Sequence, residues 1–324
     1  VFAAVGLILL TVLPEVFASP FVGLLIAVII YAVGGGLLEV LVSPIMEACP
    51  TENKEKAMSL LHSFYCWGCT GVVLLSTLFF ALFGTSHWKI LALIWVLLPT
   101  ANLILFTKVP IYSLHEEGES GMSISELFRV KVFWLLMAIM LCAGASEQAV
   151  SQWASTFAEK GLHIQKTVGD LVGPMMFSVL MGLSRLIYGK YGEKMDLMKF
   201  MIGSGILCVI CYLLASVSSN PISGLIGCII CGFSVGIMWP GTISISSERF
   251  PAGGTAIKRG GTVLFAMLAL AGDLGCSGGP TLVGFVSSAF SGNLRLGILT
   301  AIVFPVLLFA GLCTFSRLVV KNVD

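Results

Sequence analysis

Charged residues are scarce in this sequence. Only 11% of the 324 residues are Asp, Glu, Lys or Arg, whereas 57% are hydrophobic and the mean hydropathy is +1.00. A soluble domain carries about 25% charged residues, so the composition excludes an ordinary soluble globular protein. The formal net charge is +1 and no basic run with interleaved aromatic residues occurs, which excludes nucleic acid as a partner. The composition is that of a membrane protein.

The sequence also lacks a set of residues for enzymatic chemistry. Three Cys-x-x-Cys spacings occur, but all of them lie inside apolar runs, without a neighbouring histidine or charge that would stabilise thiolates. Cysteine in such surroundings behaves as a small hydrophobic residue, so we expect no metal, no redox centre and no other cofactor. No convincing pair of nucleophile and base falls at one depth. We therefore expect that the chain is not an enzyme.

Long apolar runs fill the chain instead. A run of about 20 apolar residues crosses a bilayer, and it does so as a helix because its backbone must satisfy its own hydrogen bonds. We predict ten spans, at residues 1–17, 21–47, 57–84, 87–107, 129–156, 168–190, 197–217, 221–246, 261–289 and 294–316. The predicted fold class is an all-α polytopic membrane protein. Val1 already lies inside an apolar run, so we expect a fragment without its true N-terminus.

The positions of the cations predict the orientation in the membrane. Of the 18 lysines and arginines, fourteen fall on the side that holds the long polar connection at 108–128, and four fall on the other side. Because cytoplasmic loops carry the excess of cations, we predict that this linker and the C-terminus are cytoplasmic, in the cell (inner) membrane. Within the linker, Ser123 to Glu126 (SISE) resembles a capping box that opens a helix.

A weak internal repeat at an offset of 201 residues relates the two sides of the linker. Its matches are Gly35 with Gly236, Glu47 with Glu248 and Pro50 with Pro251. Parallel repeats of this kind typify the two halves of major facilitator transporters. We predict a partial N-terminal half of four helices at 1–107, a cytoplasmic linker at 108–128 and a C-terminal half of six helices at 129–324.

Three segments resemble the fucose-permease-like branch of the major facilitator superfamily, a branch of sugar:proton symporters. GGGLLEVLVSPIMEACPTENKEKAMSLLHSFYCWG is similar to its fourth and fifth helices, AGASEQAVSQWASTFAEKG to its seventh, and MGLSRLIYGKYGEK to the connection between its eighth and ninth. The resemblance covers the chain from the third helix of that branch onward. It implies a major facilitator fold with ten of twelve helices present, two pseudo-symmetric halves and transport by alternating access.

Two acids lie in the middle of apolar spans. Glu39 follows a triplet of glycines, and Asp273 lies in the segment AMLALAGDLGCSGGP. An ionised side chain at this depth costs at least about 2.5 kcal/mol, so it indicates a functional site. The resemblance places Glu39 at the proton-carrying carboxylate of the fourth helix, and we predict proton coupling at both acids. For Asp273 the alternative is a cap on main-chain groups freed near Gly272 and Gly275.

Polar residues near the end of the span 129–156 are candidates for substrate binding. Glu147, Gln148 and Gln152 lie on neighbouring faces of one helix. Trp153 is suited to stack its ring on a sugar. The alternative is that these residues lie near the outer mouth and are simply hydrated.

A second group of candidates for substrate binding comprises His62, Tyr65 and Trp239. His62 and Tyr65 stand where the fucose transporter of the branch has glutamine and asparagine, which leaves the identity of the sugar open. The alternative for His62 is a hydrogen bond to a neighbouring helix. Trp239 precedes Pro240, and for this ring the alternative is packing in the core.

Three charged residues lie around the connection that follows the span 168–190. Arg185, Lys190 and Glu193 belong to the segment SRLIYGKYGEK, and the resemblance implies that they form a charge network at the cytoplasmic gate. The alternative is that the cations only anchor the helix at the membrane interface.

These observations together predict a secondary active transporter. We expect proton-coupled symport of a small polar solute, a sugar or a similar compound, with that solute, protons and the lipid bilayer as partners. Efflux of drugs or metabolites by proton antiport is the alternative within transport. A membrane sensor that binds a solute without moving it is the alternative of another class.

Overall fold

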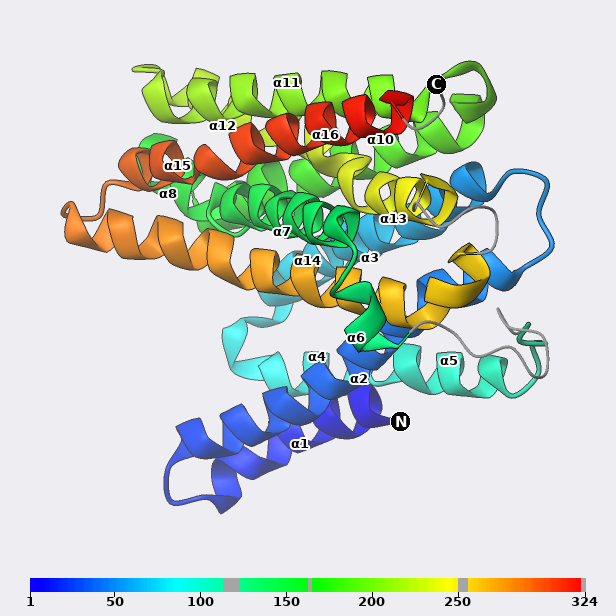
Figure 1. Cartoon of the computed structure of the whole chain (residues 1–324). Helices are drawn as coiled ribbons and strands as arrows, with labels where there is room; N and C mark the ends of the chain where they lie inside the picture. The colour runs from blue at the N-terminus through cyan, green and yellow to red at the C-terminus, as the bar shows by residue number, and fades with distance from the viewer. Residues whose placement is uncertain (113–122, 163–164, 250–255, 322–324) are drawn as a thin grey trace.

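The structure is a computed structural model that describes residues 1–112, 123–162, 165–249 and 256–321, and nearly all of them are helical (Figure 1). The elements in chain order are α1 (Phe2–Val16), α2 (Pro20–Ala48), α3 (Lys54–Phe83), η1 (Thr85–His87), α4 (Trp88–Trp95), α5 (Leu97–Phe106), α6 (Ile124–Leu127), α7 (Lys131–Ser151), α8 (Ala154–Leu162), α9 (Lys166–Asp170), η2 (Leu171–Met175), α10 (Met176–Tyr191), η3 (Gly192–Lys194), α11 (Leu197–Val217), α12 (Pro221–Gly236), α13 (Met238–Arg249), α14 (Ala256–Ala289), α15 (Leu294–Ala301) and α16 (Val303–Lys321).

Nine helical segments of the described chain are long and apolar enough to cross a membrane. They coincide with nine of the ten predicted spans, and the all-α polytopic membrane fold is confirmed. The first predicted span differs from the others. α1 is an apolar helix of 15 residues, which corresponds to about 22 Å and is shorter than a hydrocarbon core of about 30 Å.

Several spans are interrupted near their middle or toward one end. α7 passes into α8 at Gln152 and Trp153, and α12 passes into α13 at Ile237. A π segment that contains Pro174 leads into α10, because proline removes a hydrogen bond from the helical ladder. Irregular backbone at membrane depth is tolerated where it is buried in protein or lines a cavity, and transporters use it to form binding sites.

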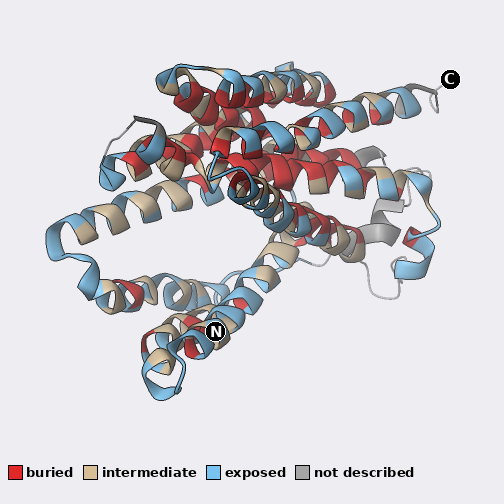
Figure 2. Cartoon of the chain, turned by 90° about the vertical axis from the view of Figure 1, so that its left-hand side faces the viewer, coloured by how far each residue is buried: buried red, intermediate tan, exposed pale blue. Residues whose placement is uncertain are grey.

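The core lies around α7. This helix packs against α14 and α16 along much of its length and also contacts α12 and α13, and Phe133, Leu136 and Met140 on it are fully buried. In Figure 2 the buried residues gather in these helices, whereas α1, α2, α4 and α5 are largely exposed. Their exposed side chains are mostly apolar, which suits contact with lipid or with other helices.

Two helix pairs make the most extensive contacts between the predicted N-terminal half and the C-terminal half. α3 packs against α10, and α2 packs against α14. The first contact is close because α10 presents glycines to α3: a Cβ on Gly182 would lie 3.1 Å from Cβ of Cys66, and one on Gly189 would lie 3.7 Å from Cβ of Leu60. These two pairs bring the polar residues of both halves together.

The structure describes only part of the predicted linker and part of the internal repeat. Residues 113–122 lie outside the described residues, so the predicted linker at 108–128 stays a prediction, as do the halves on either side of it. The predicted capping box is confirmed: Ser123 accepts a hydrogen bond from the Glu126 main chain, and the Glu126 carboxylate accepts one from the Ser123 main chain. Of the repeat, Gly35 lies within unbroken α2, whereas Gly236 ends α12. Pro251 lies outside the described residues.

Candidate functional site

Glu39 and Asp273 come together from α2 and α14. Their carboxyl groups lie within hydrogen-bonding reach of each other, and both side chains are partly buried. They meet because α2 packs along α14 at this depth. Two carboxylates in such proximity repel each other when both are ionised, so the arrangement is suited to hold one proton between them. Proton coupling at these two residues stays a prediction.

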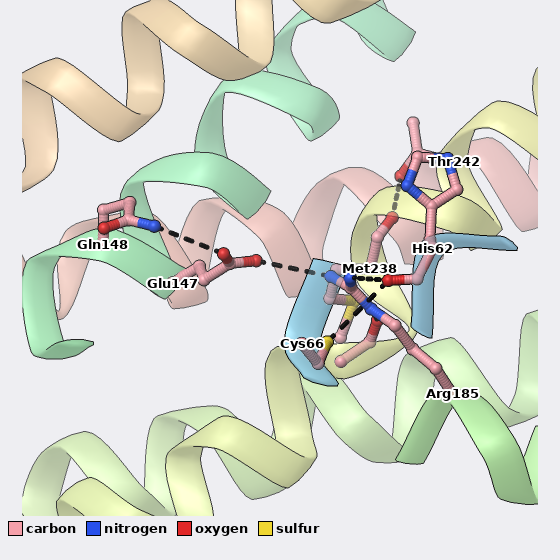
Figure 3. Close-up of polar contacts among 8 residues, drawn as sticks. His62, Cys66, Glu147, Gln148, Arg185, Met238 and Thr242 are labelled. Carbon is pink, nitrogen blue, oxygen red and sulfur yellow. Dashed lines mark hydrogen bonds and ion pairs between the residues drawn. The ribbon is translucent and has the colours of Figure 1, made fainter. Parts of the chain in front are cut away.

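A buried ion pair joins α7 and α10. Nη2 of Arg185 on α10 lies 3.6 Å from Oε2 of Glu147 on α7 (Figure 3). Glu147 is 5% and Arg185 2% exposed. Gln148 donates a hydrogen bond of 3.3 Å from Nε2 to the other carboxylate oxygen of Glu147. Each charge is expensive to bury alone, so each is tolerated here because the other balances it.

The guanidinium of Arg185 also connects two further helices, α12 and α3. Nε donates to the main-chain oxygen of Gly236 at 2.7 Å, and Nη1 donates to that of His62 at 2.7 Å (Figure 3). The Gly236 carbonyl is available because α12 ends there, and the last carbonyls of a helix have no partner within it. The Arg185 guanidinium also lies 5.8 Å from the centre of the Tyr65 ring, within reach of a cation–π contact. One side chain thus ties α10 to α7, α12 and α3.

The position of Arg185 corrects part of the predicted gate. Its side chain is buried within α10 and does not reach the connection after that helix. Glu193 forms its ion pair with Lys56 of α3, with 2.7 Å between Nζ and Oε1, and the ammonium of Lys190 lies 5.2 Å from the Tyr191 ring. Among the described residues these three charges do not form one network, because Arg185 is directed to α7, α12 and α3 whereas Glu193 pairs with Lys56. Their role in gating stays a prediction.

His62 and Tyr65 lie on α3 in different surroundings. Nε2 of His62 lies 3.2 Å from Oγ of Ser43 on α2, so the expected alternative of a hydrogen bond to a neighbouring helix describes this side chain. Tyr65 is 50% exposed, and its ring lies beside the Arg185 guanidinium. Substrate binding by the two residues stays a prediction.

Gln148, Gln152 and Trp153 mark the end of α7 and its break into α8. Gln148 is half-buried against Glu147, and Gln152 is exposed. Trp153 is turned toward α14: its Nε1 donates to the main-chain oxygen of Pro280 at 3.1 Å, and its ring lies so close to Gly284 that a Cβ there would come within 2.8 Å of Cζ2. The indole therefore has a packing role, and its stacking on a sugar stays a prediction.

Replacing Trp153 with phenylalanine is expected to lower the free energy of unfolding by about 1 kcal/mol. An aromatic ring remains, but it is smaller than the indole and the hydrogen bond to Pro280 is lost. The thermal midpoint of the purified protein in detergent is the measurement, and Trp95→Phe serves as the control because the described residues show no hydrogen bond from that indole. Equal midpoints for the two variants would contradict the expectation.

Trp239 is covered on the face that meets α14. The side chain is 7% exposed, and a Cβ on Gly272 would overlap its ring. The alternative of packing in the core therefore describes this residue better than a place in an open cavity. Gly272 is the reason the ring fits, since any other residue would displace it.

Sequence reasoning missed polar partners that α3 contributes to α10. Tyr188 donates a hydrogen bond to the Glu55 carboxylate, and Ser59 donates to the main-chain oxygen of Arg185 at 2.8 Å. Glu55 and Ser59 lie one turn apart on α3, so their shared face was available as a signal. Among the described residues, no group of three or more His, Cys, Asp or Glu side chains has a geometry that would hold a metal ion.

The family of the chain follows from comparison with known proteins. The sequence matches the family model of the Major Facilitator Superfamily over residues 1–280. No curated protein sequence matches it. The structure of the E. coli fucose:proton symporter FucP is similar, with a TM-score of 0.73 at 17% identity, over 97% of this chain and 81% of that chain.

Two further solved structures share the fold. The human organic anion transporter MFSD10 (TETRAN) has a TM-score of 0.68 at 14% identity, over 96% of this chain and 75% of that chain. A bacterial homolog to the human lysosomal transporter Spinster, in an inward-facing and unoccupied conformation, has a TM-score of 0.65 at 15% identity, over 99% of this chain and 83% of that chain. At these identities the likeness concerns the fold alone. By its match to the family model, this integral membrane protein belongs to the major facilitator superfamily of secondary transporters.

Proposed function

We propose that this chain acts in proton-coupled symport of a sugar or similar small polar solute by alternating access. The observation that carries the proposal is the pair of carboxyl groups of Glu39 and Asp273, on α2 and α14. α2 belongs to the predicted N-terminal half and α14 to the C-terminal half, and alternating access moves such halves against each other. A proton bound between these residues therefore changes how strongly the two halves are held together, and so affects their movement in alternating access.

The repulsion within the pair is large enough to drive such a motion. Two unit charges about 4 Å apart interact by about 4 kcal/mol at an effective dielectric constant of about 20. This energy changes a conformational equilibrium roughly a thousandfold, because about 1.4 kcal/mol corresponds to a factor of ten. With one proton between them the carboxyl groups hold α2 and α14 together. Without it their charges push the two helices apart.

The charges around the site favour a neutral solute. Arg185 is neutralised by Glu147 and covered by the protein, so it offers no free cation to an anionic solute. Gln148, Gln152 and Tyr65 carry amide and hydroxyl groups that hydrogen-bond the hydroxyl groups of a sugar. Among the solved structures that share the fold is a fucose:proton symporter, a protein that carries a solute of this class. These polar groups also favour a polar solute over the hydrophobic compounds that efflux pumps carry.

The orientation completes the proposal. The excess of cations beside the connection at 108–128 supports a cytoplasmic linker and a cytoplasmic C-terminus. Protons and solute then enter together from the outer face of the cell membrane, and release toward the cytoplasm resets the pair of carboxyl groups.

The test is uptake of labelled neutral monosaccharides into proteoliposomes with an imposed pH gradient, acidic outside. We expect accumulation above equilibrium for at least one sugar, and its loss when a protonophore removes the gradient. Asp273→Asn is expected to bring accumulation down to equilibrium. Asp196→Asn is the matched control, because Asp196 caps α11 through its side chain and asparagine caps a helix equally well. Accumulation that ignores the pH gradient, or that survives in Asp273→Asn, would contradict the proposal.

A further inference from the structure

Three carboxyl groups converge on one region from three helices. Glu147 on α7 lies near enough to Glu39 on α2 for its charge to act on that residue, and Asp273 on α14 lies beside Glu39. Cys276, one turn after Asp273, lies near enough to all three acids for their charges to act on its thiol. When three carboxylates lie close together, the charge of each one makes ionisation of the other two less favourable. The charge of Glu147 therefore bears on any proton held by the other two.

Arg185 is fixed in place by contacts that do not depend on Glu147. The main-chain oxygens of Gly236 and His62 accept hydrogen bonds of 2.7 Å each from Nε and Nη1. Because a guanidinium is planar, two such bonds set the direction of the remaining nitrogen, and Nη2 faces the carboxylate of Glu147. Carbonyl oxygens stabilise the cation without cancelling its charge, so that charge remains available to Glu147.

The other titratable groups near Glu147 do not supply a second counter-charge. Those that face it are Tyr65, Cys66 and Cys69 on α3, Glu39 on α2, Cys276 on α14 and Arg185 on α10. Asp273 on α14 lies beside Glu39. His62 lies on the same face of α3, but its imidazole meets Ser43. Phenols and thiols are neutral near neutral pH. Within this group of described residues, the cation that balances Glu147 is Arg185.

We infer that Arg185 is a positioning residue that keeps Glu147 ionised and thereby confines proton exchange to the pair formed by Glu39 and Asp273. The inference rests on the proposed function, since it concerns which carboxyl groups exchange the coupling proton. In the native protein Glu147 stays a carboxylate throughout the cycle and one proton is exchanged. Without the guanidinium, Glu147 binds a proton of its own and becomes a second exchanging site.

The test is a pH titration of the purified protein in lipid, without added solute. Infrared spectroscopy counts the carboxyl groups that are protonated at each pH. The signal is the C=O stretching band of a protonated carboxyl group. Above about pH 6, where exposed carboxyl groups are ionised, we expect one titrating component in the native protein. It is lost from this range in Glu39→Gln and in Asp273→Asn. In Glu147→Gln it keeps its amplitude, although its midpoint shifts because the charge of Glu147 is gone. In Arg185→Met we expect a second component. It is absent from the double variant Arg185→Met/Glu147→Gln and from Arg185→Lys, which keeps the charge.

The outcomes separate the role of Arg185 from the assignment of the proton site to Glu39 and Asp273. A second component in Arg185→Met that Glu147→Gln removes supports the inference. A folded Arg185→Met without that component overturns it, as does a native band that Glu147→Gln diminishes. If the native band does not depend on Glu39 or Asp273, the proposed proton site fails, and the Glu147-dependent component of Arg185→Met still reports separately on Arg185.

A second measurement covers the case in which Arg185→Met does not fold well. Removing one partner of a buried ion pair is strongly destabilising, whereas replacing both partners by neutral residues is often close to neutral. Charge cancellation therefore predicts that the double variant recovers most of the thermal midpoint lost in Arg185→Met. A purely structural role through the carbonyls of Gly236 and His62 predicts no recovery, because both variants lack these bonds, and that result would overturn the inference.

Discussion

Glu39→Gln is expected to abolish proton-driven accumulation of the solute while exchange of solute across the membrane at equal concentrations continues. Glutamine matches the size of glutamic acid and still hydrogen-bonds Asp273, but it neither binds nor releases a proton. The carrier then behaves as if its coupling proton were always present. It closes and reorients with solute bound, and the pH gradient no longer gives the cycle a direction.

The measurement for Glu39→Gln is a pair of assays on the same proteoliposomes, one for accumulation under a pH gradient and one for counterflow of labelled solute. Glu15→Gln is the control, because Glu15 is an exposed acid that pairs with Lys89 on the surface and its loss is expected to change neither assay. Undiminished accumulation in Glu39→Gln would show that the proton is carried elsewhere. Loss of both assays would assign Glu39 to solute binding or folding instead.

The spans were predictable because the membrane constrains composition. A segment that crosses the bilayer must be apolar over about 20 residues and helical, and apolar runs of this length are visible in the sequence. The break at Gln152 was not predictable from hydropathy, since Lys131–Lys160 forms one apolar segment. The break at Ile237 had a signal in Pro240, which has no N–H for the helical ladder. The first predicted span, at 1–17, matches α1 (Phe2–Val16) closely, although the turn at 17–19 that follows the helix contains no charge.

The two acids of the proposed proton site were predictable one at a time. Glu39 and Asp273 were identified because an ionisable side chain in an apolar run needs a reason to be there. Their pairing was not predictable, because it depends on which helices are neighbours and on their axial register. Those are decided by tertiary packing between helices, which hydropathy does not register. Asp273 lies beside Glu39, and both its role as a proton site and the alternative of a cap on freed backbone stay predictions.

Arg185 shows where sequence proximity misleads. Lys190 and Glu193 follow it closely and lie at the end of the helix, so the three charges read as one group. The depth of Arg185 is instead set by α10, and its partner Glu147 is 38 positions away on α7. A better signal was present: one buried acid and one buried cation in neighbouring apolar spans are each too costly to bury unpaired.

Gly275→Ala is expected to destabilise the protein by about 3 kcal/mol, because α7 and α14 touch backbone to backbone at this point. A Cβ on Gly275 would overlap the main-chain oxygen of Leu141, and one on Gly279 would lie 2.5 Å from that of Ala145. Overpacking of this kind typically costs about 1–3 kcal/mol, and an oxygen on a rigid helix has no room to yield. In membranes, small residues four apart serve this close approach of two helices.

Gly278→Ala is the matched control, on the same helix and three residues away. A Cβ on Gly278 meets no atom of the described residues outside its own stretch of helix within 4 Å, and alanine favours a helix over glycine by about 1 kcal/mol. The two substitutions add the same methyl group, yet the thermal midpoint should fall in Gly275→Ala and stay equal or rise in Gly278→Ala. Equal midpoints would mean that α7 and α14 do not meet through Gly275. Because Asp273 lies two residues before Gly275, a shift of α14 in Gly275→Ala should also weaken proton-driven accumulation, whereas Gly278→Ala should leave it intact.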